Sequence, residues 1–136
     1  MKRLEVGPAG GASRVNFPAC PARAAGKRCG MFIAWTTLAT RADAEKLAAE
    51  VVARGLAACA QVEGPIASHY VWEGRPERTE EFRLCLKCLP GKIPALEAHV
   101  LGRHPYATPE WLVVRAERVG EKYLSWAGSN ATNLPL

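Results

Sequence analysis

Residues 56–89 have the sequence LAACAQVEGPIASHYVWEGRPERTEEFRLCLKCL, and this stretch decides the fold class. Strand-like runs of β-branched, aromatic and other apolar residues alternate in it with residues that favour turns. The first expected turn is Glu63-Gly64-Pro65, and the second is Glu73-Gly74-Arg75-Pro76. The stretch therefore predicts three consecutive antiparallel strands joined as a meander.

The strand-like runs alternate in polarity, and successive side chains of a strand point to opposite faces of a sheet. In the last run, one face would be apolar throughout, with Phe82, Leu84, Leu86 and Cys88. The opposite face would carry Arg83, Cys85 and Lys87. In the middle run, a second shared face would carry Ile66, Ser68, Tyr70 and Trp72. This alternation predicts a sheet with one packed side and one more polar side.

The flanking residues predict further strands and helices. Residues 31–37 and 111–116 are apolar, β-branched runs typical of strands. Apolar residues recur at helical spacing from Thr40 to Gly55 and from about Lys92 to Gly102, and residues 121–127 predict a short amphipathic helix.

The first of these helices has a recognisable start. Thr40 can cap its N-terminus, with Asp43 in the first turn, while Arg41 is expected to be solvated. The order strand, helix, strand, strand, helix, strand predicts an α+β, ferredoxin-like βαββαβ sandwich with a long β-hairpin and a short C-terminal helix. Each crossover is long enough to carry its helix between parallel neighbouring strands.

The length bounds the domain organisation. A chain of 136 residues fits one domain with one modest core, which we assign to residues 31–136. Residues 1–30 are rich in Gly and Pro, lack apolar periodicity and predict a disordered N-terminal extension. Because Met31 directly precedes the first strand, this extension is interpreted as an upstream mis-start or a dispensable tail. No apolar run approaches the length of about 18 residues that a membrane span needs, so no membrane partner is expected.

The charge distribution argues against nucleic-acid binding. The formal net charge is +5, but residues 1–30 hold six basic side chains and one acidic side chain. The remaining residues carry equal numbers of basic and acidic groups, so the domain itself is formally neutral. Phosphate binding depends on clustered Lys and Arg, and therefore nucleic acid is not an expected partner.

The cysteines indicate a reducing compartment. An odd number, five, favours free thiols over a disulfide framework, which predicts a cytoplasmic location. Cys85 and Cys88 resemble half of a metal site, but an offset of three on a strand places their sulfurs on opposite faces. Cys59, Cys85 and Cys88 are therefore interpreted as isolated small hydrophobic residues.

One sheet face is expected to need a partner. In this fold the helices cover one face of the sheet, and the other face is left bare. The aromatic side chains have more surface area than a domain of this size can bury alone. These side chains are Tyr70, Trp72, Trp111, Tyr123 and Trp126. The sequence therefore predicts self-association.

Several uncommon residues then recur at the spacing of a known family. They are Leu56-Ala57-Ala58-Cys59, Pro65-Ile66, Ser68-x-Tyr70-x-Trp72-x-Gly74, Glu81, Lys87, Ile93-Pro94-Ala95-Leu96, His104-Pro105-Tyr106, Pro109-Glu110 and Tyr123-Leu124-x-Trp126. With these residues the chain from Met31 to Trp126 resembles the CutA divalent-cation-tolerance proteins, which are similar in fold to the PII signalling proteins. The resemblance implies a PII-like homotrimer whose long hairpins pair edge to edge. Its hairpin residues would include Cys59, Ser68, Tyr70 and Trp72.

The resemblance also bears on metal binding. The copper chemistry of the family uses a cysteine and two adjacent histidines, and the matching positions here are Thr36, Arg103 and His104. His104 is thus the candidate metal ligand, with Glu110 as its candidate partner. A divalent cation, Cu or Zn, is the candidate cofactor.

Two interpretations of the loop that carries His104, Tyr106 and Glu110 stay open. In the first, these residues form a polar cleft at a subunit boundary, which binds a metal ion or a small anionic ligand. Lys87 would reach this cleft from its strand, and Trp72 and Trp126 would wall it. In the second, Pro105 and Pro109 stiffen the loop, and Tyr106 pairs locally with Glu110 to hold the trimer.

Three function classes follow from these features. The first is a non-enzymatic trimer associated with metal-ion tolerance, copper above all, that acts by binding or scaffolding. The second is a PII-like sensor that binds a small anion or a nucleotide in the cleft between subunits. A hydrolase or thiol enzyme is disfavoured, because no constellation of nucleophile, base and oxyanion donors is visible and no catalytic residue is assigned.

Overall fold

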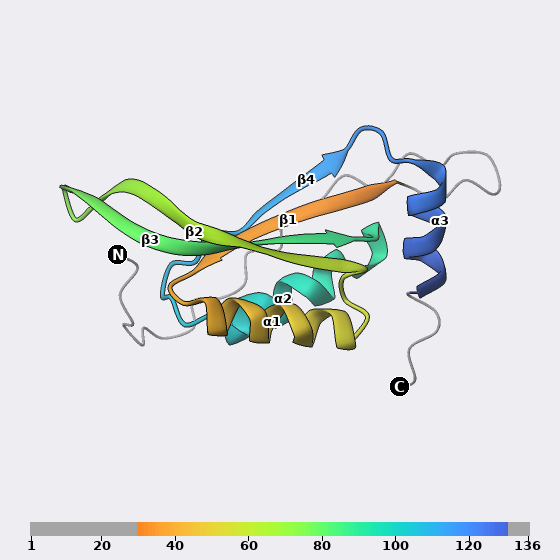
Figure 1. The fold of residues 1–136 in the computed structure, drawn as a ribbon, viewed down its shortest axis with the longest axis horizontal. Helices are drawn as coiled ribbons and strands as arrows, with labels where there is room; N and C mark the ends of the chain where they lie inside the picture. The colour runs from red at the N-terminus through yellow and green to blue at the C-terminus, as the bar shows by residue number, and fades with distance from the viewer. Residues whose placement is uncertain (1–29, 131–136) are drawn as a thin grey trace.

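The computed structural model describes residues 30–130, which form a four-stranded sheet with two helices packed on it and a third helix at one end (Figure 1). The elements are β1 (Met31–Leu38), α1 (Arg41–Ala53), β2 (Cys59–Trp72), β3 (Arg75–Cys88), a 3-10 turn (Pro90–Lys92), α2 (Ile93–Arg103), β4 (Leu112–Ala116) and α3 (Glu121–Asn130). The N-terminal extension predicted for residues 1–30 lies outside the described residues except for Gly30. No helix within residues 30–130 is long and apolar enough to cross a bilayer.

The strand order is β2-β3-β1-β4, and every neighbouring pair is antiparallel. The predicted ferredoxin-like βαββαβ fold is confirmed, including the long hairpin and the short C-terminal helix. The expectation that each helix joins parallel neighbours is wrong. β3 separates β1 from β2, and β1 separates β3 from β4, so each crossover passes over an intervening strand.

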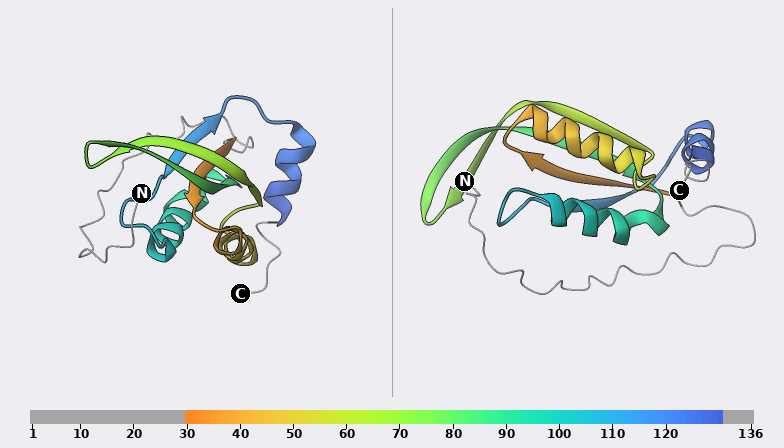
Figure 2. Two further views of the ribbon diagram at one scale, coloured as in Figure 1. Left: turned by 60° about the vertical axis from the view of Figure 1, so that its left-hand side comes forward. Right: turned by 90° about the horizontal axis from the view of Figure 1, so that it is seen from below.

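Both α1 and α2 cover the same face of the sheet (Figure 2). They contribute one side of the core with Ala44, Leu47, Ala48, Val51, Ile93, Leu96 and Val100. The sheet contributes the other side with Ala34, Leu38, Leu84, Leu86 and Cys88. The alternation predicted for β3 is therefore confirmed. Cys85 faces away from the helices as expected, yet it is 7% exposed and is not part of a polar surface.

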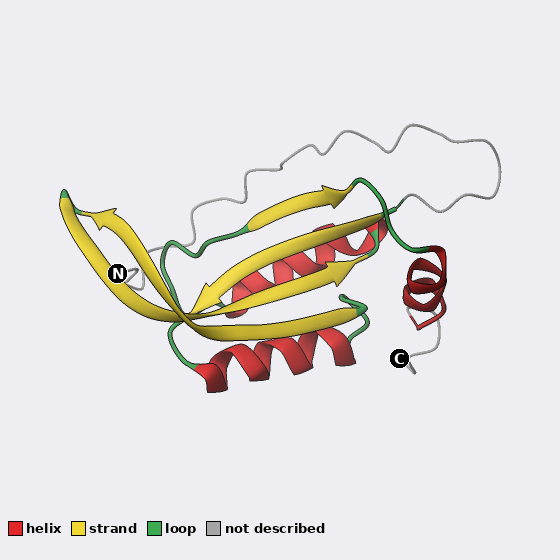
Figure 3. Cartoon of the chain, turned by 45° about the horizontal axis from the view of Figure 1, so that its top comes forward, coloured by secondary structure: helices red, strands yellow, loops and turns green. Residues whose placement is uncertain are grey.

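The β2–β3 hairpin extends well beyond the two helices (Figure 3). The predicted turn at Glu63-Gly64-Pro65 is wrong, because β2 runs through it and only the pairing register shifts between Glu63 and Ile66. That shift is a β-bulge, which bends a strand without ending it. The second turn is shorter than expected. Glu73 and Gly74 alone form it with φ values of 49° and 76°, and Arg75 already pairs with Trp72.

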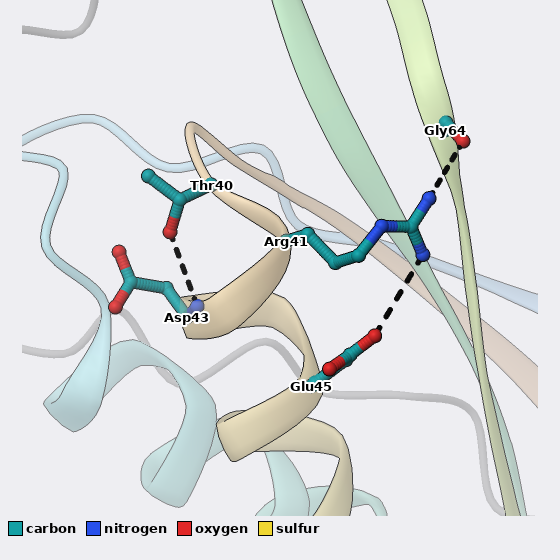
Figure 4. Close-up of polar contacts among 5 residues, drawn as sticks. All are labelled: Thr40, Arg41, Asp43, Glu45 and Gly64. Atoms are coloured by element: carbon teal, nitrogen blue, oxygen red, sulfur yellow. Dashed lines mark hydrogen bonds and ion pairs between the residues drawn. The ribbon is translucent and has the colours of Figure 1, made fainter.

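The start of α1 is tied to this bulge (Figure 4). Thr40 caps the helix as predicted, and its Oγ1 accepts a hydrogen bond of 3.1 Å from the backbone N–H of Asp43. Arg41 is not simply solvated. Its guanidinium donates to the carbonyl oxygen of Gly64 at 2.9 Å and lies 4.9 Å from the centre of the Phe82 ring. The helix therefore holds the bulge in place from below the hairpin.

Gly64 is required at the bulge for two reasons. Its φ of 149° is one that residues with a side chain rarely adopt. A Cβ atom built on it would lie 2.7 Å from Cδ1 of Phe82 and 3.0 Å from the carbonyl oxygen of Glu81. The crowding comes from the backbone of β3 as well as from a ring, so a rotamer change cannot relieve it.

We therefore predict that Gly64→Ala lowers the free energy of unfolding by about 1–3 kcal/mol through overpacking and backbone strain. Gly91→Ala is the matched control, because its Cβ would meet no atom within 4 Å. The control should change stability by no more than about 0.5 kcal/mol. Urea denaturation followed by circular dichroism measures both variants, and equal stability of the two would contradict the role of Gly64.

Candidate functional site

The loop after α2 is fastened to β1 by His104, which caps the C-terminus of that helix. Nδ1 of His104 accepts a hydrogen bond from the backbone N–H of Tyr106 at 3.1 Å. Nε2 therefore carries the ring proton, and it lies 3.1 Å from the carbonyl oxygen of Thr37 and 3.1 Å from Oγ1 of Thr36. Both ring nitrogens of His104 thus have partners within the chain.

A second attachment joins the same loop to β3. The hydroxyl of Tyr106 donates to Oε1 of Glu81 at 3.2 Å, and Glu81 is only 1% exposed. Burial, and after it the charge of Glu81 and this hydrogen bond, raise the pKa of Tyr106 far above its ordinary value. The phenol keeps its proton and serves as a donor to a buried carboxylate. Tyr106 therefore pairs with Glu81, whereas the sequence suggested a local pair with Glu110.

Glu110 belongs to a charged group on the face of the sheet that the helices leave open. Arg83 and Glu63 are register partners on β3 and β2, and their side chains form an ion pair of 2.5 Å. The hydrogen bond with Glu63 is the main cause that raises the pKa of Arg83, and the charges of Glu63 and Glu110 add to it. Glu110 thus acts electrostatically on Arg83.

The other predicted site residues lie elsewhere in the chain. Lys87 is six positions beyond Glu81 on β3, which is about 20 Å along a strand. Its ammonium group donates to Oε1 of Gln61. Trp72 ends β2 at the hairpin tip, whereas Trp126 lies on α3 at the opposite end of the molecule (Figure 1). A cleft that contains all of these side chains needs residues from neighbouring subunits, and it stays a prediction.

The copper ligands that the resemblance implies do not fit this chain. At the three matching positions stand Thr36, Arg103 and His104, so a hydroxyl and a guanidinium replace two ligands. A guanidinium has no lone pair to offer a metal ion. Among residues 30–130 no group of three or more His, Cys, Asp or Glu side chains could hold a metal ion. His104 as a ligand with Glu110 stays a prediction, and a metal ion would have to displace hydrogen bonds at His104.

A polar group that the sequence did not predict lies between the two helices. Glu50 of α1 accepts from Nε2 of His99 at 3.2 Å and lies 3.8 Å from Arg103, both on α2. Beside it is a hollow of about 130 Å³, lined by Leu38, Asp43, Lys46, Leu47, Glu50, Arg103 and Pro105. No local pattern could reveal these pairs, because Glu50 and His99 meet only when both helices pack on one sheet.

Comparison with known proteins assigns the chain to a protein family. Residues 32–130 match the family model described as CutA1 divalent ion tolerance protein. The chain is 38% identical over 94 residues to the divalent-cation tolerance protein CutA of Escherichia coli O139:H28, a match that covers 69% of this chain and 84% of that protein. The family match at residues 32–130 covers the described elements except for Met31, the first residue of β1.

Solved structures agree with this match. The structure of CutA from Synechococcus elongatus PCC7942 superposes with a TM-score of 0.72 at 33% identity and covers 75% of this chain and 90% of that chain. The protein named as the periplasmic divalent cation tolerance protein CutA from Archaeoglobus fulgidus superposes with a TM-score of 0.71 at 28% identity. That similarity covers 74% of this chain and 98% of the Archaeoglobus chain.

The bond between Tyr106 and Glu81 yields a prediction about stability. Tyr106→Phe should lower the free energy of unfolding by about 1–3 kcal/mol near pH 7, because it leaves a buried carboxylate without this donor. In a Glu81→Gln background, Tyr106→Phe should lower the free energy of unfolding by less. A hydrogen bond to a neutral amide is weaker than one to a charged carboxylate, so its removal destabilises the protein less. Urea denaturation of the four variants measures both costs, and equal costs would contradict the coupling.

The same pair sets a dependence on pH. The pKa of Tyr106 is raised above that of an unfolded tyrosine, about 10, so the stabilisation is complete below that pH and decreases as the pH rises above it. The advantage of the wild-type chain over Tyr106→Phe should therefore shrink when unfolding is measured at increasingly alkaline pH. A constant advantage would show that the phenol is not held in its protonated form.

Proposed function

Because the chain belongs to the CutA1 divalent ion tolerance protein family, we propose that it contributes to the tolerance of divalent metal ions, copper above all, as a non-enzymatic homotrimer. It acts by binding or scaffolding and needs no catalytic residue. The cytoplasm is the proposed location, since the cysteines of the described chain, Cys59, Cys85 and Cys88, are free thiols. The observation that supports assembly most strongly is the open face of the sheet.

That face presents apolar side chains to solvent in the single chain. On β4, Leu112 is 53% exposed and Val114 is 42% exposed, and Trp126 of α3 is 44% exposed. Several large apolar side chains left exposed in this way are typical of an interaction site. Copies of the same chain related by cyclic symmetry would each cover the same face of a neighbour.

The hairpin supports the same proposal. β2 is an outer strand of 14 residues, so one of its edges has no strand beside it within the described chain. Long unpaired edges are templates for strand pairing with another chain. The hydroxyl of Tyr70 on this strand is buried and has no hydrogen-bond partner among residues 30–130. In the trimer, Cys59, Ser68, Tyr70 and Trp72 are the proposed hairpin contacts.

Substitution of one apolar residue on the open face tests the assembly. Leu112→Lys should yield monomers, because a charged group would be buried against a neighbouring subunit without a partner. Val52→Lys is the matched control, since Val52 is 38% exposed on α1, which lies on the other side of the molecule. Light scattering coupled to size-exclusion chromatography measures the mass of each variant. A trimeric Leu112→Lys variant would contradict the proposed interface.

The alternative function is a PII-like sensor whose intersubunit cleft binds a small anion or a nucleotide. One observation favours a cleft between subunits: Trp72 at the tip of the hairpin and Trp126 on α3 lie at opposite ends of a single chain (Figure 1), so one chain cannot wall a cleft with both. In the trimer, Lys87 would supply the positive charge, and Trp72 and Trp126 would wall the cleft. His104 with Glu110 remains the candidate metal site of the first function.

Ligand-dependent melting separates the two functions. A ligand that binds only the folded protein raises the melting temperature with its concentration. Copper or zinc ions should stabilise the protein if metal binding is its role, whereas ATP or another nucleotide should stabilise it if it is a sensor. Substitution of Lys87 by Ala should abolish the nucleotide effect only. Stabilisation by neither class of ligand would contradict metal binding and the sensor alike, and it would leave scaffolding as the role of the trimer.

A further inference from the structure

The hollow between α1 and α2 lies on the side of the sheet that the helices cover, away from the open face (Figure 2). Its floor is apolar, with Leu38 at the end of β1, Leu47 of α1 and Pro105 of the loop after α2. Its rim consists of four charged residues, which are Asp43, Lys46, Glu50 and Arg103. An apolar recess with a few polar groups around it is typical of small-molecule sites.

Helical spacing brings the rim residues of α1 together. Asp43, Lys46 and Glu50 are separated by three and four positions, so they lie on one face of the helix. That face meets the last turn of α2, which supplies Arg103. The carboxylate of Asp43 is directed away from Arg41, which reaches the hairpin from the other side of α1 (Figure 4). Negative, positive and negative groups therefore follow one another along one wall, with a second positive group opposite.

The contacts within the rim leave its groups able to bind a ligand. One oxygen of Glu50 lies 3.2 Å from Nε2 of His99, and the other lies 3.8 Å from the guanidinium of Arg103. A separation of 3.8 Å is too long for a hydrogen bond, so Arg103 still has N–H donors for a ligand. Lys46 and Asp43 form no ion pair with any residue in the range 30–130.

The charge pattern favours a ligand that carries both signs. The rim has two basic and two acidic groups, so its formal charge is zero. An anion would be attracted by Lys46 and Arg103 but repelled by the two carboxylates, and a cation would meet the reverse. A zwitterion can place its carboxylate beside Lys46 and Arg103 and its ammonium group beside Asp43 and Glu50. Arginine also binds carboxylates with two parallel hydrogen bonds.

The volume of the hollow limits the size of this ligand. The hollow measures about 130 Å³. An engineered apolar cavity of about 150 Å³ holds one molecule of benzene. L-alanine has as many non-hydrogen atoms as benzene, and its methyl group suits an apolar floor. The side chain of L-tryptophan, in contrast, is larger than benzene by itself.

From this arrangement we propose that the hollow between α1 and α2 binds a small zwitterion, an α-amino acid of about the size of alanine. Lys46 and Arg103 bind its carboxylate, Asp43 and Glu50 bind its ammonium group, and Leu47 contacts its side chain. The site uses residues of one subunit only. It goes beyond the proposed tolerance function, and neither a metal ion nor trimer formation is needed for it.

The first test is saturation-transfer NMR of the unmodified full chain, with L-alanine as the probe. Titration of the methyl signal of L-alanine gives its Kd. Propionate lacks the ammonium group of L-alanine, and ethylamine lacks its carboxylate. Each should bind about 10-fold more weakly or worse, because each loses the charged hydrogen bonds of one half of the rim. L-tryptophan should not displace L-alanine, since it is too large for the hollow.

Substitutions locate the binding site. Lys46→Gln and Asp43→Asn each remove one charge from the rim and keep a side chain of similar length. Each should weaken the binding of L-alanine by about 10-fold or more. Arg54→Gln is the matched control, because Arg54 follows α1 and does not line the hollow. It removes a charge as well and should bind L-alanine as tightly as the unmodified chain. The melting temperature of each variant shows whether its fold is retained.

Three results would overturn the proposal. The first is the absence of saturation transfer to L-alanine. The second is equal affinity for L-alanine and for propionate or ethylamine, which would show that the two charges are not bound together. The third is unchanged affinity in folded Lys46→Gln and Asp43→Asn variants. The comparison of the three ligands needs no variant, so it decides the matter even where a substitution prevents folding. Failure of the tolerance proposal would leave these titrations unaffected, which keeps the two proposals distinguishable.

Discussion

The fold depends on one constraint, which is that both long helices pack on the same face of an antiparallel sheet. The core lies between that face and the helices, and Leu84 and Leu86 in the centre of β3 are 0% exposed. Within residues 30–130 the opposite face has no such cover, and it carries Leu112, the ion pair of Arg83 with Glu63, and the thiols of Cys59 and Cys85. The proposals for assembly and for a cleft between subunits concern what lies on that face or at its edges.

The open face is divided along β3 into two chemically distinct halves. Near the base of the hairpin, buried hydrogen bonds from His104 and Tyr106 hold the loop after α2 against β1 and β3. These bonds use the groups that a metal ion would need, so this half is better suited to holding structure than to exchanging ligands. Near α3, Cys59 is the register partner of Lys87, and Cys85 lies on the same face of the sheet.

Much of the fold could be predicted from local patterns. Alternation along 82–88 identified the core face of β3, and Thr40 marked the start of α1, because both signals depend only on residues close in sequence. Gly64-Pro65 was misjudged for the opposite reason. Gly and Pro do favour a turn at this position. Pairing between β2 and β3 continues past them, however, so the chain forms a bulge and not a turn.

The contacts of the candidate sites were harder to predict than the elements that carry them. The sequence places His104 and Tyr106 in one candidate loop, yet the partner of Tyr106 is Glu81, 25 positions away. That Cys59 and Cys85 share one face becomes visible only with the register of β2 against β3, which a misplaced turn obscures. Side-chain pairs between distant segments depend on register and packing, and neither is written in a local sequence pattern.

The central claim is that the open face of the sheet is covered by other copies of the chain. Native mass spectrometry of the unmodified full chain across a dilution series tests this claim most directly. A single species of three chains that persists on dilution is the predicted result, because each copy would bury the exposed surface around Leu112 and the free edge of β2. A stable, soluble monomer at every concentration would contradict it, since the apolar face would then be tolerated in water without a partner.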